Sequence, residues 1–340
     1  MSPWADPSTR PAPGRTVLPA STYLRLTALC PALAVDVLAP GTPVGAGWAD
    51  GAALAADAGV LDRRLEQEAA RVRELYGRAA RADVVATRVL HDYLWSVCLL
   101  MSGPWYLDRR VPLIAPGDVR IELATGRLAV VPGSFDCLGD DPAAGVPGVR
   151  GPAQEEALRG GLRSAVAEHV RPLLTALGPR VRRGPRALWG MVGDDLVAGI
   201  WHLGAALGEE WQAVRLAGEL LPGPVPPFPG GADFRPLTDR TGRAGRADRG
   251  GCADRGGLVS AAGCAGCAGC AGCAQPTRTR LGCCLHYTIQ PAETCGTCPR
   301  LRDADRLSLI ATEAASASAT SERSETSEGS AGFAEPAITA

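Results

Sequence analysis

The 340-residue sequence contains no lysine, so arginine supplies all 35 of its strongly basic side chains. This absence excludes several kinds of site that need a primary amine. The phosphate-binding Gly-Lys-Ser/Thr motif, a Schiff-base lysine and a Ser-Lys dyad all require lysine. The formal net charge is −1, so the sequence also lacks the basic excess that is typical of proteins that bind nucleic acids or membrane surfaces.

Long apolar runs are also missing. The most apolar stretch, Tyr93 to Met101, is too short to cross a bilayer, and the first fifteen residues contain no apolar run after a basic start. We therefore expect no integral membrane segment and no secretory signal, which favours a soluble cytoplasmic protein. Twelve cysteines are not expected to form disulfides in that compartment, and nine of them lie between residues 252 and 298. Clustering of this kind indicates metal or redox chemistry.

The residues before these cysteines predict a mostly helical body. Alternation of apolar and polar residues from Val119 to Leu123, a Thr125-Gly126 turn, and renewed alternation from Leu128 predict a β-hairpin. Helical periodicity predicts five helices. One has its N-cap at Asp83 and its stop at Gly103-Pro104, and the others cover residues 60–81, 151–178, 185–207 and 211–221. Glycines lower helix propensity, so we expect those of the 185–207 helix to allow close packing. They are Gly190, Gly193, Gly199 and Gly204.

The predicted fold class is therefore α+β: a mostly helical body with a small β-hairpin element and a compact C-terminal cysteine module. Low complexity and Pro, Gly or Ser enrichment mark the segments outside the body. We predict five parts: a disordered N-terminus (1–20), a mainly helical body (21–221), a Pro/Gly/Cys-rich linker or insert (222–275), the cysteine module (276–312) and a disordered tail (313–340).

The cysteine module offers four thiols as an adjacent pair, Cys283-Cys284, and a C-x2-C pair, Cys295 and Cys298, with ten residues between the pairs. A [2Fe–2S] cluster needs four thiolates, two for each iron. The short C-x2-C loop turns both sulfurs toward one centre. Adjacent side chains on a strand point to opposite faces. If Cys283 and Cys284 are both to reach the cluster, they must therefore lie in a turn or bulge, which Gly282 permits. We predict that these four cysteines bind a [2Fe–2S] cluster.

Two alternatives remain open for the module, namely a structural zinc site and unligated thiols. Zinc sites favour two C-x2–4-C pairs over an adjacent pair, and unligated clustered thiols are unusual in a reducing compartment. The remaining cysteines are less informative. The Ala-Gly-spaced run is typical of an expanded repeat, although a second cluster there is an alternative; its cysteines are Cys264, Cys267, Cys270 and Cys273. We interpret Cys30, Cys98 and Cys137 as small buried residues.

The module resembles the C-terminal cluster motif of the FhuF-like ferric-siderophore reductases. The resemblance rests on the CC-x10-C-x2-C spacing, on Leu285-His286-Tyr287 after the double cysteine and on Pro299 after the last cysteine. It implies an enzyme that delivers one electron to Fe(III) held by a siderophore, so that Fe(II) is released for iron transport. The alternative is a non-catalytic [2Fe–2S] electron carrier or an iron or redox sensor. The sequence lacks a G-x-G-x-x-G dinucleotide motif, so the implied donor is a ferredoxin or a flavin reductase.

Charged residues near the module allow two interpretations. The arginines could offset the cluster charge and attract an anionic substrate, with Arg278 and Arg280 lining its approach, or they could form a solvated surface. Those flanking the motif are Arg278, Arg280, Arg300 and Arg302. We expect His286 to form a hydrogen bond near the cluster. His91, His169 and His202 are interpreted as structural. Asp194-Asp195 is not expected to act as an acid–base pair, because adjacent helical residues do not face each other.

Overall fold

The computed structural model describes residues 17–43, 45–147, 149, 151, 154–237, 275–291 and 294–309. The chain forms two compact units. The first comprises Met1–Phe234 and Arg278–Thr294, and the second comprises Arg235–Thr277 and Cys295–Ala340. The cysteine repeat from Cys264 to Cys273 and the predicted tail lie outside the described residues. The boundaries of the five predicted parts stay predictions.

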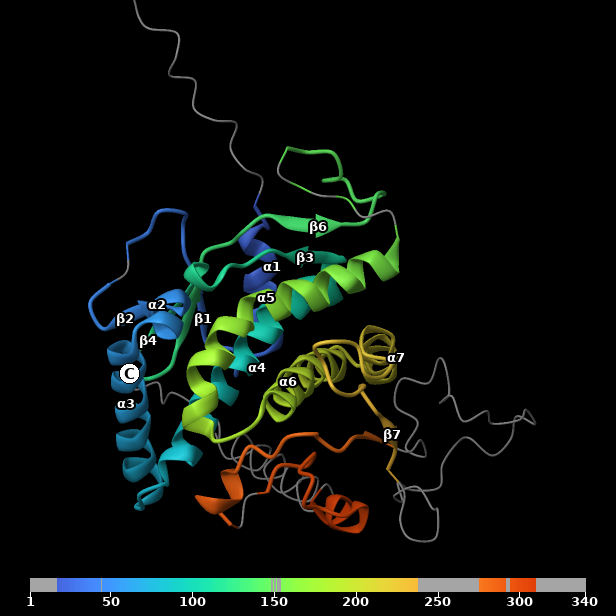
Figure 1. Ribbon diagram of the computed structural model, residues 1–340. Coiled ribbons are helices and arrows are strands. Elements are labelled where there is room, and N and C mark those ends of the chain that lie inside the picture. Colours follow the sequence, from blue (N-terminus) through green and yellow to red (C-terminus); the bar gives the residue numbers. More distant parts are fainter. Residues whose placement is uncertain are drawn as a thin grey trace, which may run out of the picture. The chain divides into compact units, whose positions relative to one another are not determined.

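Seven helices in the described residues build most of the first unit (Figure 1). The long helix α4 contacts α1, α3, α5 and α6, and its buried residues include Leu94, Val97 and Trp105. Helix α7 packs mainly on α6. The helices are α1 (Ala20–Leu29), α2 (Gly51–Ala56), α3 (Ala58–Tyr76), α4 (Ala82–Asp108), α5 (Glu155–Val181), α6 (Pro185–Ala206) and α7 (Glu210–Leu220).

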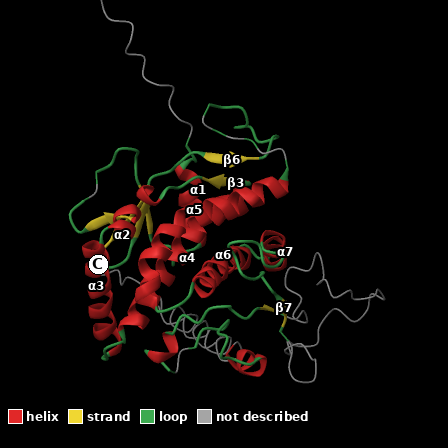
Figure 2. Cartoon of the chain, viewed as in Figure 1, coloured by secondary structure: helices red, strands yellow, loops and turns green. Residues whose placement is uncertain are grey.

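Two small sheets complete this unit. The predicted hairpin is confirmed, because β4 pairs antiparallel with β5 and Gly126 has the positive φ of 80° that its turn requires. The larger sheet has the order β1-β5-β4-β2, and β3 pairs with β6. The strands are β1 (Val35–Val37), β2 (Trp48–Asp50), β3 (Arg110–Pro112), β4 (Val119–Glu122), β5 (Leu128–Val130) and β6 (Phe135–Cys137). The α+β class with a helical body is confirmed (Figure 2).

Helix α4 differs from its predicted limits at both ends. Arg81 occupies the N-cap, and Asp83 lies in the first turn. The helix then continues through Gly103-Pro104 to Asp108, so the predicted stop is wrong. Gly103 serves close packing, since a Cβ there would lie 2.6 Å from Leu26 Cδ1. Pro104 costs about 3 kcal/mol as a helix-interior proline, and burial of the surrounding turn offsets this cost.

Helix α4 is also long and apolar enough to cross a membrane by length and composition alone. Its most apolar 18-residue window is 72% buried inside the protein. Burial of this degree is what a core helix shows, because its apolar side chains already pack against neighbouring helices. In this fold α4 therefore acts as the helix around which α1, α3, α5 and α6 pack.

The α6 glycines allow close approach of neighbouring elements, as predicted. A Cβ on Gly199 would lie 3.2 Å from Leu99 Cδ1 of α4, and one on Gly190 would lie 3.2 Å from Leu281 Cβ. The tightest position is Gly204, where a Cβ would lie 2.1 Å from Ala213 Cβ of α7. Since real Cβ atoms do not approach so closely, α6 and α7 must separate if Gly204 gains a side chain.

We expect Gly204→Ala to lower the free energy of unfolding by about 1–3 kcal/mol, because overpacking outweighs the gain in helix propensity. Gly218→Ala is the matched control, since Gly218 lies in α7 with no atom within 4 Å of the added methyl group. This control should raise the free energy of unfolding by about 0.5–1 kcal/mol. Urea denaturation followed by circular dichroism measures both changes. Equal effects of the two substitutions would contradict the packing argument.

The described part of the second unit is small. Strand β7 (Arg235–Pro236) pairs antiparallel with β8 (Pro276–Thr277), and the backbone N–H of Leu237 donates to the carbonyl of Gln275. Residues 303–309 are helical. This pairing places residues 235–237 beside residues 275–277.

Candidate iron–sulfur site

The adjacent cysteines follow a segment that is fixed to α6 of the first unit. The backbone N–H groups of Leu281 and Gly282 both donate to the Asp194 carboxylate, at 3.1 and 2.8 Å. A Cβ on Gly282 would lie 2.8 Å from Met191 Cγ, so glycine allows the segment to lie directly on the helix. The backbone immediately before Cys283 is therefore held in place by α6.

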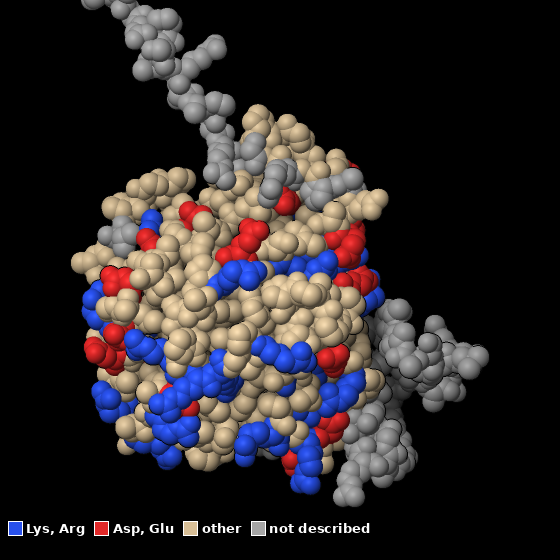
Figure 3. All heavy atoms as spheres, in the orientation of Figure 1, with Lys and Arg blue, Asp and Glu red and all other residues tan. Residues whose placement is uncertain are grey.

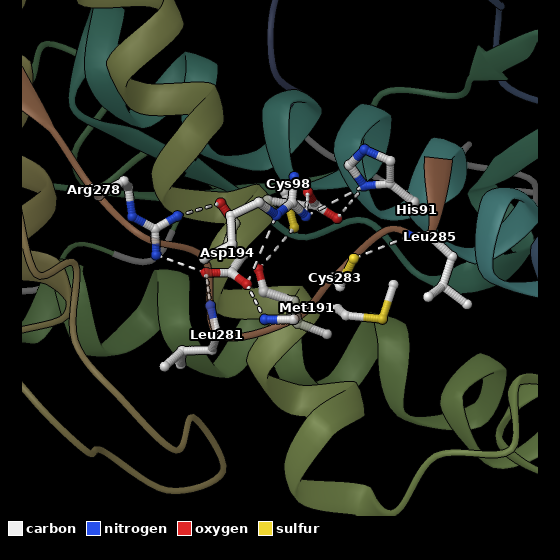
Figure 4. A network of polar contacts seen from close by, with 12 residues as sticks. His91, Cys98, Met191, Asp194, Arg278, Leu281, Cys283 and Leu285 are labelled. Carbon is white, nitrogen blue, oxygen red and sulfur yellow. Dashed lines mark hydrogen bonds and ion pairs between the residues drawn. The ribbon is translucent and has the colours of Figure 1, made fainter. Parts of the chain in front are cut away.

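The chain turns directly after the adjacent cysteines. Leu285 has a positive φ of 62°, and the 3₁₀ helix η2 (His286–Thr288) follows it. The Leu285 N–H donates to Cys283 Sγ at 3.4 Å (Figure 4). Cys283 and Cys284 are both half-buried. The pair thus lies between the bend at residues 281–282 and this turn, and an N–H aimed at sulfur is the kind of contact that stabilises a thiolate.

A buried charge network lies beneath this segment. Asp194 and Asp195 of α6 are fully buried, and each has its own arginine partner. Arg278 Nη2 donates to Asp194 Oδ1 at 2.7 Å, and Arg280 Nη2 donates to Asp195 Oδ1 at 2.6 Å. Asp195 Oδ2 also lies 3.0 Å from His91 Nδ1 of α4. Figure 4 shows Asp194 between Arg278 and the backbone of Leu281. Two carboxylates thus join the cysteine segment to two helices of the body.

The positions of Arg278 and Arg280 correct an interpretation made from the sequence. Their side chains are only 1% and 7% exposed, so they do not line a solvent-accessible approach for a substrate. Arg300 and Arg302, in contrast, are exposed. Asp194 and Asp195 are the buried partners of Arg278 and Arg280, and the sequence alone does not predict these pairs. The sequence does contain a signal for these ion pairs. Two acidic residues in a strongly apolar helix need buried cations, and an Arg-x-Arg pair precedes the cysteines.

The network shifts the protonation equilibria of its members. Burial raises the pKa of Asp194 from its ordinary value, and Arg278 and Arg280 offset only part of this rise. Burial acts in the same direction on Asp195, but His91 and Arg280 outweigh it, and the pKa of Asp195 is lowered. Burial alone would lower the pKa of His91, yet Asp195 outweighs this effect and the pKa is raised. Asp195 and its two partners therefore favour their charged forms inside the protein.

A second contact region holds the other end of the segment. Ile289 is buried with Val72 of α3 and Val84 of α4 in a small hydrophobic cluster, against which Leu285 packs. Arg88 Nη1 lies 3.2 Å from His286 Nδ1. Since arginine only donates, Nδ1 of His286 accepts this bond. The expected hydrogen bond of His286 is therefore present, with an arginine of α4 as its donor.

The C-x2-C pair lies in the second unit and forms its own tight turn. The backbone N–H of Cys298 donates to the carbonyl of Cys295 at 2.9 Å. Arg306, which is 3% exposed, donates to the carbonyls of Gly296 and Cys298, both at 2.9 Å, and pairs with Asp303. Cys295 is half-buried and Cys298 is buried. Arg306 was not identified from the sequence, because its carbonyl acceptors leave no residue-type signal.

The donor set fits a [2Fe–2S] cluster by its chemistry, since four thiols in two closely spaced pairs match two irons with two thiolates each. Within the described ranges, no group of three or more His, Cys, Asp or Glu side chains has a geometry that could hold a single metal ion. Cluster ligation by Cys283, Cys284, Cys295 and Cys298 stays a prediction. The other described cysteines, Cys30, Cys98 and Cys137, are buried as predicted.

The cysteine module is similar to a known protein family. Residues 280–300 match the family model of the FhuF 2Fe-2S C-terminal domain, which confirms the resemblance inferred from the motif. This domain indicates a [2Fe–2S] cluster as the cofactor, so the cofactor prediction is confirmed. The curated proteins give no match to the chain. The matched segment contains both cysteine pairs, and the helical body lies outside it.

Proposed function

We propose that this protein is a cytoplasmic ferric-siderophore reductase in which Cys283, Cys284, Cys295 and Cys298 hold the [2Fe–2S] cluster. The observation that supports this proposal is the FhuF 2Fe-2S match over residues 280–300, which includes all four cysteines. The cluster supplies a carrier that stores and releases a single electron. Reduction of Fe(III) in a siderophore releases the metal, because the hard oxygen ligands hold Fe(II) much more weakly.

The chain's own residues position the cysteines for this chemistry. Asp194 fixes the backbone before Cys283, and the Leu285 N–H supports its sulfur. Arg306 fixes the turn that carries Cys298. Each pair is thus held by contacts within its own unit, which limits the local rearrangement that accompanies loss or gain of an electron and favours rapid transfer. The electron itself comes from an external donor, a ferredoxin or a flavin reductase.

The reductase function predicts that a ferric hydroxamate oxidises the anaerobically reduced protein and that Fe(II) appears in equal amount to the oxidised cluster. Stopped-flow absorbance follows the cluster, and a chromogenic Fe(II) chelator follows the metal. The gallium(III) complex of the same siderophore is the control, because it has the same shape and charge but accepts no electron. Equal reoxidation rates with the ferric and gallium complexes, without Fe(II), would instead support an electron carrier or sensor.

A further inference from the structure

Two connections between helices place a group of arginines at one end of the first unit. The α3–α4 connection carries Arg78 and Arg81, and the α5–α6 connection with the first turn of α6 carries Arg182, Arg183 and Arg186. We call these five residues the arginine collar. Contacts link the two connections.

Arg180, at the end of α5, forms an ion pair with Asp62 in the first half of α3, which places the end of α5 beside that helix but not at its connection to α4. Asp83 of α4 forms an ion pair with Arg81, which lowers the pKa of the Asp83 carboxyl. The positive charge of Arg182 acts on this pKa in the same direction. The arginine collar is therefore one basic surface, although its residues are about 100 positions apart in the sequence.

The arginine collar borders the segment that carries Cys283 and Cys284. Arg183 Nη1 lies 3.5 Å from the sulfur of Met191, the residue on which Gly282 rests. At the other end of the segment, Ile289 packs on Val84, three residues after the α3–α4 connection. The basic surface thus approaches the segment from both of its ends.

Most of this positive charge is not neutralised. Within the described part of the chain, no carboxylate forms an ion pair with Arg78, Arg182, Arg183 or Arg186. Arg78, Arg182 and Arg186 are exposed. Figure 3 shows basic side chains gathered in the region where α3 and α5 end and α4 begins. In a chain with a net charge of −1, this is a local asymmetry and not a general basic character.

We infer that the arginine collar is the docking surface for an acidic electron-donor protein, an inference that rests on the proposed function. The guanidinium groups extend from the ends of four helices, so they match an extended acidic surface better than one small anion. Exposed, unpaired arginines contribute mainly to the rate of encounter, and electron-transfer complexes use small, charged and transient interfaces. Such a partner would meet the protein beside the adjacent cysteines.

The test is a triple variant, Arg78→Gln/Arg182→Gln/Arg186→Gln, reduced by an acidic plant-type [2Fe–2S] ferredoxin in stopped flow. We expect the second-order rate constant to fall about tenfold at low ionic strength, and its dependence on salt to become weaker. Reduction by methyl viologen radical, a small cation, should stay within about twofold of wild type, because it does not use the basic surface. The matched control is Arg25→Gln/Arg127→Gln/Arg215→Gln, which removes three exposed arginines elsewhere.

Several outcomes would overturn the inference. They are an unchanged ferredoxin rate and salt dependence in the collar variant, an equal loss in the control variant, or an equal loss with methyl viologen. Failure of the proposed function is recognised separately. In that case the wild-type protein would lack the cluster absorbance, or its reduced cluster would not react with ferric hydroxamate even though ferredoxin reduces it.

Discussion

Cys284→Ser is expected to leave the helical body folded but to remove most of the visible absorbance and the low-temperature EPR signal of the cluster. One thiolate of the proposed set is lost, and a serine oxygen is a harder and weaker ligand for an iron–sulfur cluster. Electron transfer to ferric hydroxamate should fall by about a hundredfold or more. Anaerobic purification, iron analysis and EPR of the reduced protein measure the loss.

Cys137→Ala is the matched control for this substitution. Cys137 is also a thiol in the described chain, but it is fully buried in β6, where it pairs across the sheet with Arg110. Its loss should leave the iron content and the EPR signal unchanged. If Cys284→Ser retained the wild-type iron content and spectrum, Cys284 would not be a ligand. If zinc were present in place of iron, the zinc alternative would be correct.

Asp194→Ala is expected to destabilise the first unit by about 3–5 kcal/mol. The substitution leaves Arg278, which is 1% exposed, as a buried charge without its carboxylate, and breaking such a buried pair has a cost of this size. It also removes the acceptor of the Leu281 and Gly282 N–H groups. Asp62→Ala is the control, because Asp62 and Arg180 form an exposed ion pair that should contribute only about 0–1 kcal/mol. Chemical denaturation measures both effects.

A second variant separates stability from positioning. Asp194→Leu/Arg278→Met replaces the buried ion pair by apolar side chains of similar size, which is often neutral for stability. We expect this variant to regain most of the stability lost in Asp194→Ala, yet to lose its cluster faster than wild type during dilution into a chelator. Wild-type cluster retention in the double variant would show that Asp194 acts on stability alone.

The features that the sequence predicted well are local ones. The hairpin of β4 and β5 depends on alternation over a few residues and on Gly126, and α6 begins at the proline that marks its first turn. The cysteine spacing is likewise a local pattern, and it was sufficient to identify the domain over residues 280–300.

The errors arose where distant contacts decide the structure. Gly103 and Pro104 are usual stop signals and predict an early end for α4, whereas Leu26 of α1 packs on that turn and the helix continues to Asp108. Arginine is usually solvated, so the sequence alone predicts Arg278 and Arg280 at the surface. Their carboxylate partners are 84 and 85 positions away in the sequence, and no local pattern connects them.

This separation of the buried charges has a consequence for biosynthesis. Asp194 and Asp195 leave the ribosome 84 and 85 residues before their arginines, so a nascent chain that has completed α6 still lacks the cations that its interior needs. The body therefore cannot reach its final packing during translation until the segment ahead of Cys283 has been made. A polypeptide that lacks that segment keeps two buried carboxylates without their arginine partners, so completion of the body depends on the same stretch of chain that leads into the first thiol pair.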